Sequence, residues 1–252
     1  MAAARPVQSI PGNLNPGNIG LFLDVDGTLV DIAPRPEAVE VTASLLDDLA
    51  AAERALSGAL ALVSGRPIAE LDRLFAPLRL AAGGVHGAQL RRRPGGAVAS
   101  LASGRLGDDA WDALRGLLAR FPGCYAENKE VSFAVHYPSG TDSPRLEAAL
   151  TRLMHRLSAT GRQLKLIAGQ AVFELQLKGF DKGRVIRCFM ADGPFRGRQP
   201  VFVGDDEIDR AGFDMALALG GFAFSVGIAL PGLSGMFSGP DAVRRWLHEL
   251  GR

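Results

Sequence analysis

Short apolar runs alternate with segments of helical periodicity in the first part of the chain. We interpret residues 20–24, 58–63 and 78–84 as strands. The first segment is apolar up to Asp24 at its end and the second is apolar throughout, which is typical of strands buried on both faces of a parallel sheet. Between them, residues 37–54 and 67–75 place leucine and alanine at helical spacing. This order of elements predicts an α/β fold with a doubly wound parallel sheet.

The alternation changes in the middle of the chain, where two helix-strand-strand units follow one another. The predicted elements are helices at 106–121 and 144–159 and strands at 123–127, 131–137, 163–167 and 171–177. Such a pattern favours a small antiparallel sheet with helices on one face. The first pattern then resumes, with helices at 182–191, 207–219 and 241–250 and strands at 200–203 and 222–226. We therefore expect a Rossmann-like core of residues 1–96 and 180–252 and an inserted α+β cap domain at 97–179.

Composition narrows the class of protein. The chain has 252 residues, of which 47% are hydrophobic, and this is enough for a sizeable core. Its net charge of +1 argues against nucleic acid or a membrane surface as the main partner, and Arg91, Arg92 and Arg93 are expected to form a solvated loop. Cys124 and Cys188 form no C-x-x-C pair, so we expect a reduced, cytoplasmic protein. Separately, we expect a monomer.

Two segments invite a membrane interpretation and do not support it. Residues 215–240 carry no charge, but glycines and Pro231 interrupt any continuous apolar helix. Residues 1–18 lack the apolar region of a signal peptide, so we interpret them as a loose tail.

Acidic residues follow two of the predicted core strands. Asp24 and Asp26, with Gly27 beside them, follow the first strand, while Asp205, Asp206 and Asp209 follow the strand at 200–203. If the strands are parallel neighbours, these carboxylates meet at one edge of the sheet, where all-oxygen ligation favours Mg²⁺. A strand-end turn could account for the first pair alone. The helix macrodipole could account for Asp209 and its neighbour Glu207.

A second group of polar residues points to an anion. Ser64 and Gly65 end a predicted strand just before a helix, and Lys182 begins another core helix. A hydroxyl and free N–H groups at a helix N-terminus can bind phosphate, and lysine adds positive charge. Simple capping by Ser64 and a solvated Lys182 are the alternatives.

The order of these segments resembles the haloacid dehalogenase (HAD) superfamily of aspartate-nucleophile phosphatases, and more narrowly the trehalose-6-phosphate phosphatases. The resemblance rests on Asp24 to Leu29, Ser64 to Arg66, Asp181 to Gly183, Gly204 to Asp206, Gly84 to Ala88, Glu127, Lys129, His136 with Tyr137, Gly169 and Glu174. The sequence departs from the family pattern at Pro138, Gln170 and Arg210. The first two departures concern substrate contacts and the third concerns the surroundings of the metal.

The resemblance implies a HAD-type core and a reaction through an aspartyl-phosphate. Asp24 would be the nucleophile and Asp26 the general acid and base, while Ser64, the Gly65 amide and Lys182 would neutralise the phosphoryl oxygens. Mg²⁺ would be held by Asp24, the Asp26 carbonyl and Asp205. Asp206 and Asp209 would brace its bound waters.

The resemblance also implies that the cap closes over a sugar phosphate. The residues expected to bind the sugar are Glu127, Lys129, His136 and Glu174. Because strand positions alternate between faces, we expect about half of these four to point away from the substrate. Arg66 is expected to bind phosphate or sugar. His86 fits either a substrate contact or a packed residue at a strand end.

Other functions compete with the hydrolysis of trehalose 6-phosphate. A phosphatase of sucrose phosphate or of a hexose phosphate would carry the same motifs, because specificity resides in the cap. A sugar phosphomutase would pass the aspartyl-phosphate to a second hydroxyl. A catalytically idle sensor is disfavoured because a binder needs no nucleophile, and a serine hydrolase is excluded by the absence of G-x-S-x-G.

Overall fold

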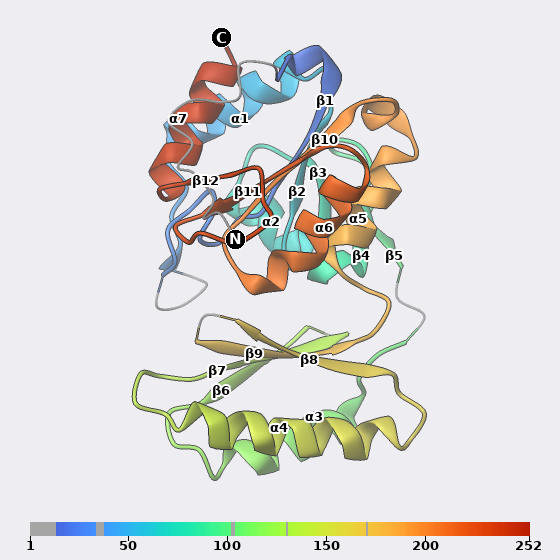
Figure 1. Cartoon of the computed structure of the whole chain (residues 1–252). Helices are drawn as coiled ribbons and strands as arrows, with labels where there is room; N and C mark the ends of the chain where they lie inside the picture. Colours follow the sequence, from blue (N-terminus) through green and yellow to red (C-terminus); the bar gives the residue numbers. More distant parts are fainter. Residues whose placement is uncertain (1–13, 34–37, 102–103, 130, 170) are drawn as a thin grey trace. The chain divides into compact units, whose positions relative to one another are not determined.

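The computed structural model describes residues 14–33, 38–101, 104–129, 131–169 and 171–252, and the chain divides into two compact units (Figure 1). Residues 1–101 and 181–252 form the core unit, and residues 102–180 form the cap unit. We had placed the start of the insertion at residue 97. It lies later because Ala99–Ser100 still pairs with a strand of the core sheet.

The core unit is built on an eight-stranded sheet of order β12-β11-β10-β1-β2-β3-β4-β5. Its strands are β1 (Ile19–Leu23), β2 (Leu60–Val63), β3 (Ala81–Gly84), β4 (Gln89–Arg91), β5 (Ala99–Ser100), β10 (Gln199–Gly204), β11 (Phe222–Val226) and β12 (Gly235–Phe237). The pairs from β12 to β3 are parallel, and β4 and β5 join antiparallel. From β1 the chain proceeds to one side and from β10 to the other, so a topological switch point lies between these two strands.

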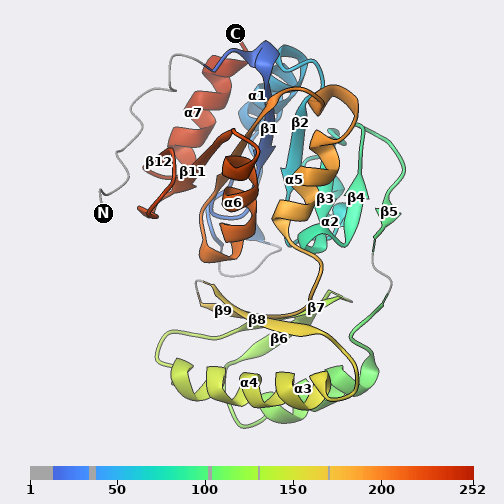
Figure 2. The same cartoon turned by 45° about the vertical axis from the view of Figure 1, so that its right-hand side comes forward.

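Helices cover both faces of this sheet. They are α1 (Ala43–Ala55), α2 (Ile68–Leu74), α5 (Lys182–Met190), α6 (Arg210–Ala218) and α7 (Pro240–Leu250). Right-handed connections place α1 and α6 on opposite faces, since β1 to β2 and β10 to β11 run in opposite directions along the sheet. In both views α1 lies beside α7 and α5 beside α6 (Figure 2). The predicted doubly wound α/β core is confirmed.

The cap unit is an antiparallel sheet with two helices packed on one face (Figure 1). The helices are α3 (Asp108–Leu118) and α4 (Ser143–Ser158), and the sheet of order β6-β7-β9-β8 comprises β6 (Tyr125–Asn128), β7 (Ser132–His136), β9 (Val172–Leu177) and β8 (Leu164–Gly169). Phe133, Val135, Phe173 and Leu175 fill the space between sheet and helices. The predicted α+β architecture of the insertion is confirmed.

Several elements differ from the predictions. Helix α1 begins only at Ala43, where Thr42 Oγ1 accepts a hydrogen bond from Leu45 N, and the predicted start at residue 37 lies outside the described residues. The expected helix at 207–219 begins with a separate 3₁₀ turn, Glu207–Asp209. The short strands β4, β5 and β12 were not predicted. Three or fewer residues give no periodicity, and β12 lies among glycines.

The prediction of a loose tail at residues 1–18 is wrong for residues 14–18. Leu14 packs in the core and Pro16–Asn18 forms a 3₁₀ turn, while residues 1–13 lie outside the described part of the chain. Within the described residues, no helix is long and apolar enough to cross a membrane. Cys124 and Cys188 are both free thiols.

The prediction that Arg91 lies in a solvated loop is wrong. This side chain is 1% exposed and lies in β4, where Nε donates to the carbonyl of Leu80 at 2.8 Å. Its two other nitrogens pair with the Asp72 carboxylate at 2.8 and 2.7 Å. Hydrogen bonding to Arg91, opposed by partial burial, lowers the pKa of Asp72. Arg92 and Arg93 are exposed, as expected.

Replacement of Arg91 by alanine should destabilise the core unit. We expect Arg91→Ala to lower the free energy of unfolding by about 3 kcal/mol, the low end for breaking a buried ion pair, because Asp72 keeps some contact with solvent. Urea unfolding measures this loss. The matched control, Arg93→Ala, removes an exposed arginine of the same cluster and should change stability by less than about 0.5 kcal/mol. Equal losses in the two variants would contradict a structural role for Arg91.

Candidate active site

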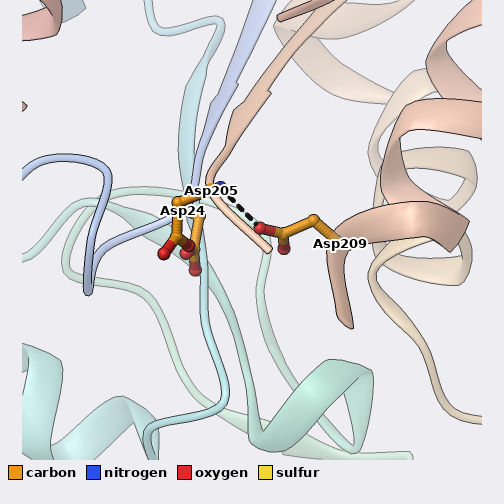
Figure 3. A group of neighbouring side chains, drawn as sticks. All are labelled: Asp24, Asp205 and Asp209. Carbon is orange, nitrogen blue, oxygen red and sulfur yellow. Dashed lines mark hydrogen bonds between the residues drawn. The ribbon is translucent and has the colours of Figure 1, made fainter. Parts of the chain in front are cut away.

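The site lies at the carboxyl ends of the two central strands, β1 and β10. Asp24 follows β1, and its N–H donates to the carbonyl of Val203 on β10 at 2.9 Å. Asp205 directly follows β10. Carboxylate oxygens of Asp24, Asp205 and Asp209 all lie within 4.8 Å of one another. Figure 3 shows Asp24 and Asp205 pointing the same way, with Asp209 reaching toward them.

Lys182 sits among these carboxylates. It is the first residue of α5, whose N-cap Asp181 accepts a hydrogen bond from Arg184 N, and its side chain is 4% exposed. The ammonium donates to Asp24 Oδ1 at 2.6 Å and forms a second ion pair with Asp209 Oδ1. The alternative of a solvated lysine is therefore wrong.

Burial and crowding shift the pKa values of this group. Burial raises the pKa of Asp24 well above its ordinary value; Lys182 opposes this, and the charges of Asp209 and Asp205 add to it. Burial, followed by the charge of Asp209, raises the pKa of Asp205 to about 7. Burial alone would lower the pKa of Lys182, but its ion pairs with Asp209 and Asp24 outweigh this effect and raise that pKa. Lys182 thus stays charged, while the nearby positive charge is too small to balance the three carboxylates.

Asp209 also organises the loop that carries Asp205. Its Oδ2 accepts hydrogen bonds from the N–H groups of Asp205 at 2.9 Å and Asp206 at 3.3 Å. The side chain of Asp206 instead accepts from Glu207 N and caps the 3₁₀ turn. Of the five predicted metal-site residues, the structure gathers the carboxylates of Asp24, Asp205 and Asp209. Those of Asp26 and Asp206 are engaged elsewhere.

The side chain of Asp26 pairs with Arg66. Arg66 Nε lies 2.8 Å from Asp26 Oδ2, and Nη2 lies 2.7 Å from Oδ1, a two-pronged geometry that fixes the carboxylate plane. The turn that bears Asp26 is closed by Gly27 N to Val30 O at 2.9 Å. Gly27 has φ of +75°, and a Cβ there would lie 2.1 Å from Asp205 Oδ2. A side chain at this position would therefore displace the Asp205 carboxylate.

Ser64 and Gly65 form a compact turn after β2. Ser64 is buried, and its Oγ accepts from Arg66 N at 3.1 Å, so it holds the turn rather than capping α2. The first amide of α2, Ile68 N, donates instead to Gln89 Oε1. A Cβ on Gly65 would lie 2.6 Å from His86 Nε2. His86 is buried against this turn, so the structure favours the interpretation of a packed residue at a strand end.

Comparison with known proteins decides the family. The family model described as trehalose-phosphatase matches residues 22–227. The trehalose-6-phosphate phosphatase of Escherichia coli strain K12 is 38% identical over 229 residues, covering 91% of this chain and 85% of that protein. The chain belongs to the trehalose-phosphatase family. It is accordingly a phosphoric monoester hydrolase, and the family suggested by the motifs is confirmed.

Solved structures agree with the fold. The C-terminal domain of a trehalose-6-phosphate phosphatase from C. albicans superposes with a TM-score of 0.79 at 20% identity, covering 100% of this chain and 99% of that one. A haloacid dehalogenase-like hydrolase from B. subtilis gives 0.65 at 15% identity over 90% and 98% of the two chains. At these identities the likeness concerns the fold alone, and it confirms the predicted HAD-type core.

The cap of this trehalose-phosphatase family member carries a polar sheet face. Glu127 pairs in register with Ala134, and Ala134 with Glu174, so both glutamates share one face. Glu127 also lies 3.0 Å from His136 Nε2 and 3.7 Å from Lys129 Nζ. A hydrogen bond from His136, against partial desolvation, lowers the pKa of Glu127. The four therefore do not divide between the two faces of the sheet, as strand alternation had led us to expect, because all four lie on the face opposite the helices.

Two buried polar residues of the same face were missed. Ser132 is two residues before Ala134, and Gln176 is two residues after Glu174, so the period of two along each strand was an available signal. Of the departures from the family pattern, Pro138 is exposed beyond β7 and Arg210 pairs with Glu207 at the surface. Gln170 lies outside the described residues.

Proposed function

We propose that this protein hydrolyses trehalose 6-phosphate to trehalose and phosphate, with Mg²⁺ as cofactor, through an aspartyl-phosphate intermediate. One observation carries the proposal. A buried carboxylate, Asp24, is held by Lys182 beside Asp205 at the switch point of a trehalose-phosphatase family fold. The substrate follows from the name of the E. coli relative.

The reaction would proceed in two displacements. In the first, a carboxylate oxygen of Asp24 attacks phosphorus, the bond from phosphorus to the sugar oxygen breaks, and Asp26 protonates the departing oxygen. In the second, Asp26 takes a proton from water, the water oxygen attacks phosphorus, and the bond to Asp24 breaks. Lys182 donates to Oδ1 of Asp24 and would hold the attacking carboxylate in place during both displacements.

Arg66 would serve this reaction through Asp26. Both nitrogens that it turns to Asp26 are occupied by that carboxylate, and its Nη1 lies 3.9 Å from Glu70. We therefore assign Arg66 to the orientation of the general acid and base, a narrower role than the binding of phosphate or sugar expected from the sequence. The Ser64 hydroxyl, the Gly65 amide and the Lys182 ammonium would donate to the phosphoryl oxygens.

The charges of the site fit a hard divalent cation. Among the described residues, the carboxylates of Asp24, Asp205 and Asp209 share one buried ammonium, so negative charge exceeds positive charge when these carboxylates are ionised. Asp24, Asp205 and the backbone carbonyl of Asp26 would hold Mg²⁺, while Asp209 would keep Asp205 in place and Asp206 would stabilise the loop by capping the 3₁₀ turn. The bound cation would neutralise charge on the transferred phosphoryl group.

Recognition of the sugar would fall to the polar face of the cap sheet. Glu127 and Glu174 can accept hydrogen bonds from hydroxyls, whereas Lys129 can only donate, and His136 can do either. Glu174 is 2% exposed, so its contact with a ligand would exclude water and contribute strongly to specificity.

Asp24→Asn should abolish turnover while preserving the fold. The amide is isosteric but cannot attack phosphorus, so we expect phosphate release to fall by about 10⁴-fold. Circular dichroism checks the fold. Asp214→Asn, an exposed position on α6, is the matched control and should keep full activity. A rate above about one hundredth of the wild type for Asp24→Asn would refute the nucleophile assignment.

Gly27→Ala should remove the response to Mg²⁺. Both Gly27 and Gly95 have positive φ, so alanine should cost each variant about 1 kcal/mol of stability. Only Gly27→Ala also displaces Asp205, since Gly95 has nothing within 4 Å. We expect Mg²⁺ to raise the melting temperature of the wild type and of Gly95→Ala, but not of Gly27→Ala. An equal rise in melting temperature with Mg²⁺ in all three proteins would contradict the proposed metal site.

Glu174→Ala should damage sugar recognition selectively. Loss of a charged hydrogen-bond acceptor predicts a fall of about 10- to 100-fold in kcat/KM for trehalose 6-phosphate, with little change for p-nitrophenyl phosphate. Glu147→Ala, at an exposed position of α4, is the control and should change neither rate. If Glu174→Ala slows both substrates equally, then Glu174 does not read the sugar.

A further inference from the structure

Two buried polar side chains of the cap each carry a polar atom that has no hydrogen-bond partner in the part of the chain that the structure describes. Ser132 is 0% exposed and Gln176 is 1% exposed. Ser132 Oγ and Gln176 Nε2 are both unsatisfied. Each such group costs about 1–3 kcal/mol, and folded proteins satisfy nearly all of them. Two of them side by side therefore require an explanation.

The two residues belong to one row across the cap sheet. Ser132 on β7 pairs in register with Gln176 on β9, which pairs with Lys165 on β8. Across the hairpin, Lys129 N donates to the carbonyl of Ser132 at 2.9 Å. We call Lys129, Ser132, Gln176 and Lys165 the donor row.

The donor row lies on the polar face of the sheet. Phe133 and Leu175, the residues next to Ser132 and Gln176, pack in the apolar core against the helices. Since side chains alternate along a strand, Ser132 and Gln176 face the other way, as Glu174 does. The neighbouring row contains the carboxylates of Glu127 and Glu174.

The chemistry of the two rows selects a class of ligand. Gln176 Nε2 needs an acceptor, and the carboxylates next to it, one of which already lies 3.0 Å from His136 Nε2, can accept hydrogen bonds but cannot donate them. An isolated anion would be repelled by Glu127 and Glu174, and an isolated cation by Lys129 and Lys165. A neutral polyol satisfies both rows, because each hydroxyl donates and accepts. Glu174 and Gln176 are two residues apart on one strand, about 7 Å, which one hexose ring with its hydroxyls can bridge.

We propose that Ser132 and Gln176 complete the sugar-binding surface of the cap and help to determine its specificity. Gln176 donates to a sugar hydroxyl near those that Glu174 accepts from, and Ser132 bonds to the same hydroxyl or its neighbour. This inference rests on the proposed function. It adds two residues that neither the motifs nor the family resemblance identified.

The test combines kinetics with stability. Gln176→Met keeps the length of the side chain and removes the amide, and Ser132→Ala removes the hydroxyl. Each should raise KM for trehalose 6-phosphate by about tenfold, equivalent to about 1.4 kcal/mol, and leave p-nitrophenyl phosphate hydrolysis unchanged. Neither should lower the melting temperature, because each removes an unsatisfied buried group. Gln163→Met, the same substitution at an exposed cap residue, is the control.

The remaining outcomes overturn the inference in distinguishable ways. If the wild type prefers trehalose 6-phosphate but the variants keep its KM, Ser132 and Gln176 do not contact sugar and merely hold buried water. If the wild type shows no preference for a sugar phosphate, the proposed function fails and this inference fails with it. Should Gln176→Met not fold, Gln176→Glu replaces the amide donor by an acceptor beside two lysines, and the same rise in KM is expected.

Discussion

The active centre depends on the ammonium of Lys182, which lies between the buried carboxylates of Asp24 and Asp209. Breaking such a pair by removing one partner is costly, because the remaining charge stays in a medium that solvates it poorly. This contact joins three segments that are distant in sequence: the end of β1, the start of α5 and the loop after β10. Asp205 lies close to Asp24, and the single ammonium of Lys182 provides too little positive charge for these carboxylates. Such a site favours the binding of a divalent cation.

Further contacts hold the side chains that we propose as reactive groups in fixed positions. Asp209 grips the backbone of Asp205, Arg66 fixes the plane of Asp26, and Gly27 gives Asp205 room beside the Asp26 turn. Electrostatic catalysis depends on donors and charges that need not reorganise during the reaction. We therefore propose that the HAD-type core supplies the phosphoryl chemistry as a rigid frame, and that the polar face of the cap sheet would supply specificity.

Much of the core could be predicted from local pattern. Leu21 to Leu23 are continuously apolar because β1 is covered on both faces, and strand ends in a parallel sheet bring Asp24 and Asp205 to one edge. The local pattern does not show which distant residue each polar side chain contacts. Asp206 and Asp209 look alike in sequence, yet one caps a turn and the other reaches Lys182. Likewise Arg91 differs from Arg93 because it lies in β4 and contacts Asp72 and the Leu80 carbonyl, which the arginine cluster itself does not reveal. The shared face of Glu127 and Glu174 followed from strand register, which single-strand alternation does not give.

The most direct test of the account is phosphate release in the presence of Mg²⁺ from four substrates: trehalose 6-phosphate, sucrose 6-phosphate, glucose 6-phosphate and an aryl phosphate. The account predicts a kcat/KM for trehalose 6-phosphate at least about 100-fold above the others, because buried polar groups of the cap stay unpaired with the wrong sugar. Equal rates on all four would keep the aspartate chemistry of the core but contradict the assignment of trehalose 6-phosphate as the substrate.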